Sequence, residues 1–172
     1  MDIKLVVDGF KIPVGYELLE TIVDRIGDHE ELQDFYHKMV ESRNPDVLYA
    51  IAYYDNLRAD TIKILLDVGE MRVVERVLNS SERIAKVSKE QILEVLEKYH
   101  DTEVFKAVAS NFESINVENP NEILDTILDI AKDNLAVIGA IADGYDIPTY
   151  ILKKLANHSD IDISRKAKGS LE

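Results

Sequence analysis

A six-residue pattern, repeated along the last three-quarters of the chain, constrains the fold more than any other feature. It reads V-[LVFI]-x-[AR]-[VI]-[AL], and four copies begin at Val47, Val73, Val104 and Val137. A fifth, degraded copy begins at Ile163, so the starts are 26, 31, 33 and 26 residues apart. A period in this range is typical of a helical solenoid, in which each unit buries its apolar face only by stacking on neighbours.

Each repeat is predicted to hold two helices, of which the six-residue pattern forms the first. Short polar residues before the first helices are the types that cap helix N-termini, and they occur at Asn44-Pro45, Asp101, Asp133-Asn134 and Asp160. Apolar runs at helical spacing predict the second helices, at 61–66, 91–96, 122–128 and 150–156. Between the helices, longer loops are expected at Ser80–Lys89 and Phe112–Asn121.

The residues before the repeats have a different character. The β-branched segment 1–12 contains the turn signal Asp8-Gly9 and predicts an extended arm or a short hairpin. Two helices without the repeat pattern follow, at about 16–26 and 30–40, and would cap the first repeat. The predicted fold is all-α, one domain over 1–172 that comprises an arm (1–12), capping helices (13–44) and helical repeats (45–170).

One segment carries a family resemblance. Residues 148–167 combine a proline-started helix with paired leucines, an acidic turn and a second short helix. This segment resembles a leucine-rich repeat variant unit and, more loosely, a HEAT-like repeat. The resemblance implies a right-handed α-α superhelix (an α-solenoid). Some relatives carry an iron–sulfur cluster on cysteines, and many HEAT-like modules bind proteins.

Composition narrows the possible functions. The chain has no cysteine, which excludes disulfides, thiol catalysis and cysteine-bound metals, the iron–sulfur cluster included. The net charge is −13, and residues 101–150 hold ten acids against two bases. A surface of this sign repels phosphate backbones, so a nucleic-acid partner is disfavoured. No apolar run is long enough for a membrane span, no signal peptide is evident, and a cytoplasmic location is expected.

Superposing the copies separates buried from exposed positions. The second and fifth positions are apolar in most copies and predict the core, whereas the fourth is small in three copies and predicts a close approach between helices. The third and seventh positions are polar or small in every copy but the first, where they hold Tyr49 and Tyr53. Both positions are therefore expected to face solvent.

Two tyrosines four residues apart on an exposed stripe suggest a binding surface, because tyrosine is enriched at interface hot spots. The predicted partner-binding residues are Tyr49, Tyr53, Glu75, Asn79, Lys106, Ser110 and Asp143. The alternative is that the capping helices cover the two tyrosines.

Signals for catalysis are weak. The four histidines, His29, His37, His100 and His158, include no pair at the spacing that places two metal ligands on one helical turn. Asp55 and Asp60 flank a loop near Arg58, where they are expected to cap a helix or to bind.

The sequence therefore predicts a protein–protein interaction module or scaffold without catalytic activity, cofactor or metal, whose partner is another protein with a basic surface. One alternative is an acidic inhibitor or immunity-type protein that covers a basic active site. The other is an enzyme with a site on the concave face of the solenoid.

Overall fold

The computed structural model describes residues 4–7, 9–26, 30–144 and 146–171. Apart from one short β-hairpin, the regular structure within them is helical, with 12 α-helices, which confirms the predicted all-α class. The contacts group the chain into two compact units, residues 1–77 and 78–172. The organisation of residues 1–172 as one domain stays a prediction.

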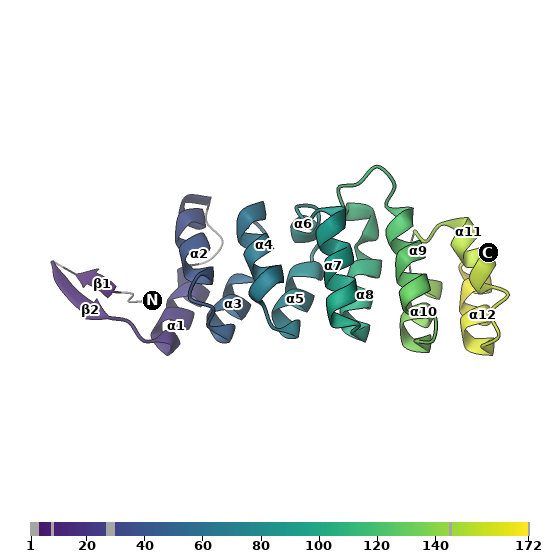
Figure 1. Cartoon of the computed structure of the whole chain (residues 1–172), viewed down its shortest axis with the longest axis horizontal. Coiled ribbons are helices and arrows are strands. Elements are labelled where there is room, and N and C mark those ends of the chain that lie inside the picture. Colours follow the sequence, from purple (N-terminus) through teal and green to yellow (C-terminus); the bar gives the residue numbers. More distant parts are fainter. Residues whose placement is uncertain (1–3, 8, 27–29, 145, 172) are drawn as a thin grey trace. The chain divides into compact units, whose positions relative to one another are not determined.

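The first unit begins with a β-hairpin, shown in purple in Figure 1. Strands β1 (Lys4–Val7) and β2 (Phe10–Pro13) pair in antiparallel register, with Lys4 opposite Pro13. Gly9 lies in the turn at a φ of +83°, a conformation that glycine adopts without steric cost. The predicted short hairpin is thereby confirmed.

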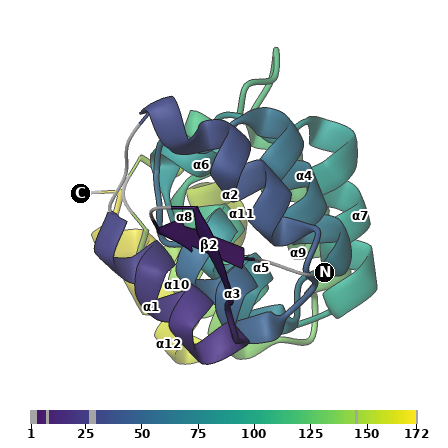
Figure 2. The same ribbon diagram turned by 90° about the vertical axis from the view of Figure 1, so that its left-hand side faces the viewer.

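The helices of the first unit match the predicted cap and the first repeat. Their bounds are α1 (Tyr16–Ile26), the 3₁₀ helix η1 (Glu30–Leu32), α2 (Gln33–Val40), α3 (Pro45–Ile51), α4 (Ala59–Val68) and α5 (Met71–Leu78), the last of which crosses the boundary between the units. Helix α3 packs against α1 and α2, and α2 also packs against α4. Figure 2 shows the helices of this unit turned toward the viewer.

The second unit repeats the two-helix pattern (Figure 1, teal to yellow). Its helices are α6 (Ser81–Ile84), α7 (Lys89–Tyr99), α8 (Thr102–Ser110), η2 (Phe112–Ser114), α9 (Asn121–Ile130), α10 (Leu135–Ala142), α11 (Thr149–Leu155) and α12 (Ile161–Gly169). All five copies of the repeat pattern are helical, as are all four predicted second helices. Short helices α6 and η2 lie where loops were expected, and the Ser80 hydroxyl caps α6 by accepting a bond from the Arg83 amide.

Consecutive first helices pack side by side in the second unit. Helix α10 contacts both α8 and α12. Two hydrogen bonds join these neighbours. The side-chain amide of Asn134 donates to the Thr102 hydroxyl at 2.8 Å, and the Ser170 hydroxyl donates to the backbone carbonyl of Ala142 at 3.0 Å. The fifth position of the repeat is buried in all five copies, as predicted, at Ile51, Val77, Val108, Ile141 and Ala167. The second position is buried in the first four, at Leu48, Val74, Phe105 and Ile138.

Helix starts follow the predicted capping signals. The side chains of Asn44, Asp101 and Asp160 each accept two backbone N–H groups of the following helix. At the pair Asp133-Asn134 the cap is Asn134, whose side-chain oxygen accepts the Val137 amide at 3.2 Å. These bonds satisfy N–H groups that have no partner inside the helix.

Asn134→Ala is therefore expected to lower the free energy of unfolding by about 1–2 kcal/mol, because it removes both the cap and the bond to Thr102. Asp133→Ala is the matched control, since Asp133 is exposed and caps nothing, and its effect should stay within about 0.5 kcal/mol. Urea denaturation measures both values. Equal losses in the two variants would contradict the assignment of the cap.

Candidate partner-binding surface

The seventh position of the repeat is exposed in every copy and lies at the C-terminal end of each first helix. Tyr53 follows α3 by two residues and is 65% exposed. The other members are also exposed, at Asn79, Ser110, Asp143 and Gly169. The last carbonyl groups of a helix lack internal partners and carry partial negative charge. The seventh positions therefore lie beside partial negative charge.

The third position of the repeat does not face solvent throughout, which corrects the prediction. Tyr49, Glu75 and Lys106 are half-buried, and Gly139 is buried. A Cβ atom added at Gly139 would lie 3.9 Å from the Ile163 side chain on the next first helix. In these four copies the third position is therefore not fully exposed, and long side chains there reach solvent only with their terminal atoms.

Two arginines of α5 lie over the tyrosines of the first repeat. The Arg76 guanidinium is 5.1 Å from the centre of the Tyr49 ring and 5.0 Å from that of Tyr53. It also donates a hydrogen bond of 2.6 Å to the Tyr49 hydroxyl. The Arg72 guanidinium is 5.3 Å from the Tyr49 ring. These four residues, Tyr49, Tyr53, Arg72 and Arg76, are called the Tyr–Arg cluster below.

Acidic residues hold Arg72 in place. Its guanidinium donates to Asp46 at 2.7 Å and lies 3.6 Å from Glu70. The hydrogen bond to Asp46 is the main cause of the raised pKa of Arg72. The predicted partner-binding residues include neither arginine. The repeat carried a signal for Arg72, because Arg72 stands 26 residues after Asp46, at the corresponding position of the next copy.

The capping helices do not cover Tyr53, which remains largely exposed. The tyrosine that contacts the cap is Tyr54, whose hydroxyl donates to the Val23 carbonyl in α1. Its ring lies 5.0 Å from that of Tyr36 in α2, and Tyr54 is buried. The alternative that the capping helices cover the two tyrosines is therefore wrong for Tyr53.

In the second unit, two of the predicted partner-binding residues form ion pairs. Lys106 pairs with Glu103 at 2.8 Å within α8. Asp143 pairs with Lys166 at 3.2 Å, which joins the end of α10 to α12. Lys166 occupies the fourth position of its copy, as Arg76 does in the second copy, so both cations reach the end of the preceding first helix.

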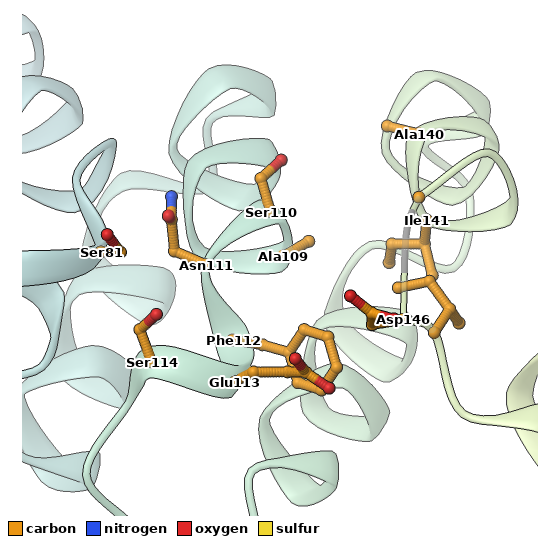
Figure 3. A pocket seen from close by; sticks show the side chains of 12 residues that line it. Ser81, Ala109, Ser110, Asn111, Phe112, Glu113, Ser114, Ala140, Ile141 and Asp146 are labelled. Atoms are coloured by element: carbon orange, nitrogen blue, oxygen red, sulfur yellow. The ribbon is translucent and has the colours of Figure 1, made fainter.

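Ser110 borders a pocket of about 370 Å³, shown in Figure 3. Phe112, Ile141 and Ile147 contribute apolar side chains to it, and Glu113 and Asp146 contribute carboxylates. Ala140 also lines this pocket and is half-buried. Ala50 and Ala107 at the same position are buried, and the close approach of helices at the fourth position stays a prediction.

The histidines make local contacts. His37 Nδ1 lies 3.1 Å from the Thr61 hydroxyl and 3.6 Å from the Asp60 carboxylate. A catalytic triad needs the acid and the nucleophile on different ring nitrogens, whereas both groups here face Nδ1. Thr61 is also fully buried. Asp60 accepts the amide of the next residue, Thr61, at 2.8 Å, whereas the N-cap position of α4 is Arg58, so the expected capping role of Asp60 is wrong.

The other two described histidines lie at helix ends, and His29 lies outside the described residues. His100 ends α7 in a left-handed conformation, and His158 Nδ1 accepts the Asp160 amide at 3.0 Å. The carboxylate of Asp60 has a lowered pKa although burial opposes the shift, because Arg58 and the Thr61 amide donate hydrogen bonds to it. Among the described residues no group of three or more acidic or histidine side chains could hold a metal ion.

Tyr150, on α11, has a strongly shifted pKa. Loss of hydration at its hydroxyl and a 2.7 Å hydrogen bond to Asp125 on α9 raise the pKa of Tyr150 to about 12. The shift favours the neutral phenol in the folded protein. This bond therefore ties two consecutive second helices together below the pH at which the phenol ionises.

Comparisons with models of known protein families, with curated proteins and with solved structures found no match for this chain. Among the helices that the structure describes, none has the length and apolar character that a bilayer crossing requires.

The raised pKa of Tyr150 gives a pH-dependent contribution to stability. The contribution is complete below the ordinary tyrosine pKa of 10.0 and is lost as the pH rises through about 12. Ultraviolet difference titration against Tyr150→Phe should show a phenol that ionises near the upper value. Asp125→Asn should move the pKa downwards, and a Tyr150 that ionises near 10 in the unmodified protein would contradict the assignment.

Proposed function

We propose that this chain is a protein–protein interaction module built from helical repeats, and that its partner binds at the Tyr–Arg cluster. The observation that carries the proposal is the state of Tyr53, which is 65% exposed and yet has a guanidinium over its ring. A large exposed aromatic side chain that a neighbour already orders loses little entropy when a partner covers it. Tyrosine and arginine are also the residue types enriched at interface hot spots.

The same proposal extends to the fold: the chain is an α-solenoid of stacked two-helix repeats. The stack is right-handed, as the resemblance of the chain to leucine-rich repeat variant and HEAT-like proteins implies. The side-by-side packing of α8, α10 and α12 supports it within the second unit. Within the second unit, such a stack would place the exposed seventh positions Asn79, Ser110 and Asp143 on one further binding surface with Lys106, while Glu75 belongs to the first unit with the Tyr–Arg cluster.

The partner is proposed to be a protein with a basic surface. Residues 101–150 carry ten acids against two bases, and the exposed ends of the first helices add partial negative charge. In the first unit, Asp46 pairs with Arg72, one of the two cations of the Tyr–Arg cluster. A module of this kind needs no catalytic group, and the proposed location is the cytoplasm.

Tyr53→Ala tests the proposed site. Partners are captured from a lysate of the native host with the unmodified chain as bait, and the affinity of the recovered protein is then measured for each variant. Tyr53→Ala should weaken binding by about 2 kcal/mol, the size of a true hot spot, with the melting temperature unchanged because the ring is exposed.

Phe10→Ala is the matched control, because Phe10 is an aromatic residue 75% exposed outside the Tyr–Arg cluster. It should leave the affinity unchanged. The proposal fails if Tyr53→Ala binds as tightly as the unmodified chain, or if its affinity falls only in step with its thermal stability.

Salt separately tests the charge of the partner. Exposed charges are screened beyond about 8 Å at physiological ionic strength, so a basic partner should bind more weakly and associate more slowly as salt is added. Association rates at a series of salt concentrations measure this. A rate that is independent of salt would contradict a basic partner while leaving the Tyr–Arg cluster as the site.

A further inference from the structure

The pocket in the second unit combines an apolar wall with acidic groups at its edge. Its volume is about 370 Å³. Phe112, Ile141 and Ile147 are all at most 8% exposed, so the protein core holds the wall in place. The described residues that line the pocket include no lysine or arginine. A ligand that enters it therefore meets apolar surface and negative charge together.

The two carboxylates of the pocket have no cation beside them. Glu113 and Asp146 are exposed, and neither makes an ion pair or a side-chain hydrogen bond with another residue that the structure describes. Elsewhere in this unit, Glu103, Glu122 and Asp143 each pair with a lysine. Figure 3 shows both carboxylates among the side chains that line the pocket, Glu113 from η2 and Asp146 from the segment before α11. A cationic ligand in the pocket would therefore meet no competing cation among the described residues that line it.

We propose that this pocket binds an arginine side chain of a partner protein. The methylene stem would lie along the apolar wall, and the guanidinium would donate hydrogen bonds to Glu113 and Asp146. Arginine suits the site better than lysine, because its planar guanidinium is weakly hydrated and pairs with carboxylates through two parallel bonds.

This inference rests on the proposed function, since in the cell the arginine would belong to the partner. It names a second contact, in a different unit from the Tyr–Arg cluster, and gives a chemical reason for a basic partner. Ser110 belongs both to the predicted partner-binding residues and to the lining of the pocket.

The first experiment measures the arginine side chain alone. N-acetyl-arginine amide is titrated into the isotopically labelled full chain, and amide chemical shifts are followed by NMR. We expect saturable shifts confined to residues of the pocket, such as Phe112, Glu113 and Ile141. N-acetyl-citrulline amide has the same shape without the charge and should bind at least about tenfold more weakly.

Two outcomes of this titration would overturn the proposal. One is the absence of localised shifts with the arginine compound, and the other is equal binding of the citrulline compound. N-acetyl-lysine amide should also bind more weakly than the arginine compound. Equal affinity for lysine would overturn the choice of arginine.

The second experiment removes the carboxylates without changing their size. Asp146 has a φ of 59°, and Asp146→Asn keeps a residue type that tolerates this left-handed conformation. The double variant Glu113→Gln, Asp146→Asn should lose at least about tenfold in affinity for N-acetyl-arginine amide. Asp129→Asn is the matched control, because Asp129 is exposed in the same acidic part of the chain and does not line the pocket.

An equal loss of affinity in Asp129→Asn would show that only the net charge attracts the ligand, and would overturn the pocket as a specific site. If the double variant fails to fold, the comparison of arginine with citrulline on the unmodified chain decides the question. The titrations need no partner protein, so their failure is distinguishable from failure of the proposed function, which the Tyr53→Ala variant tests at the Tyr–Arg cluster.

Discussion

The burial of the apolar face of each first helix against neighbouring helices is the constraint on which the rest of the structure depends. The fifth position of each repeat is buried in all five copies and the second position in the first four. A short amphipathic helix of about nine residues is unstable alone, so it persists only because its neighbours cover this apolar face. The same packing determines what the other positions can do. The third position is half-buried or buried in the first four copies, and the seventh remains exposed at the helix end.

The Tyr–Arg cluster arises from one departure from this pattern. The fourth position is alanine in three copies, but in the second copy it is Arg76, whose guanidinium lies between the rings of Tyr49 and Tyr53. Each cation–π contact at an exposed site contributes only about 0.5–1 kcal/mol. The contacts therefore add little to overall stability, and their main effect is to order aromatic surface before a partner arrives, which lowers the entropic cost of binding.

Much of the fold could be predicted from the sequence, because periodicity and capping act locally. The helices that contain the repeat pattern, the caps at Asn44, Asp101 and Asp160, and the N-terminal hairpin all follow from short-range signals. The site was harder, because exposure depends on the neighbouring helix. A glycine and a glutamate are both compatible with a solvent-facing column, yet Gly139 is buried against Ile163 whereas Glu75 is half-buried. The pocket beside Ala140 is formed by three segments distant in sequence, and the repeat pattern carries no signal for it.

The central claim is that a partner protein covers Tyr53, and site-specific photo-cross-linking tests it most directly. A photoreactive benzoyl-phenylalanine is placed at position 53, and at position 10 as a control, because Phe10 is an aromatic residue at least as exposed as Tyr53. The chain is then irradiated in a lysate of the native host. We expect a discrete adduct with one protein from position 53 that is absent from position 10. The absence of an adduct at position 53, or the same set of adducts from both positions, would contradict the claim.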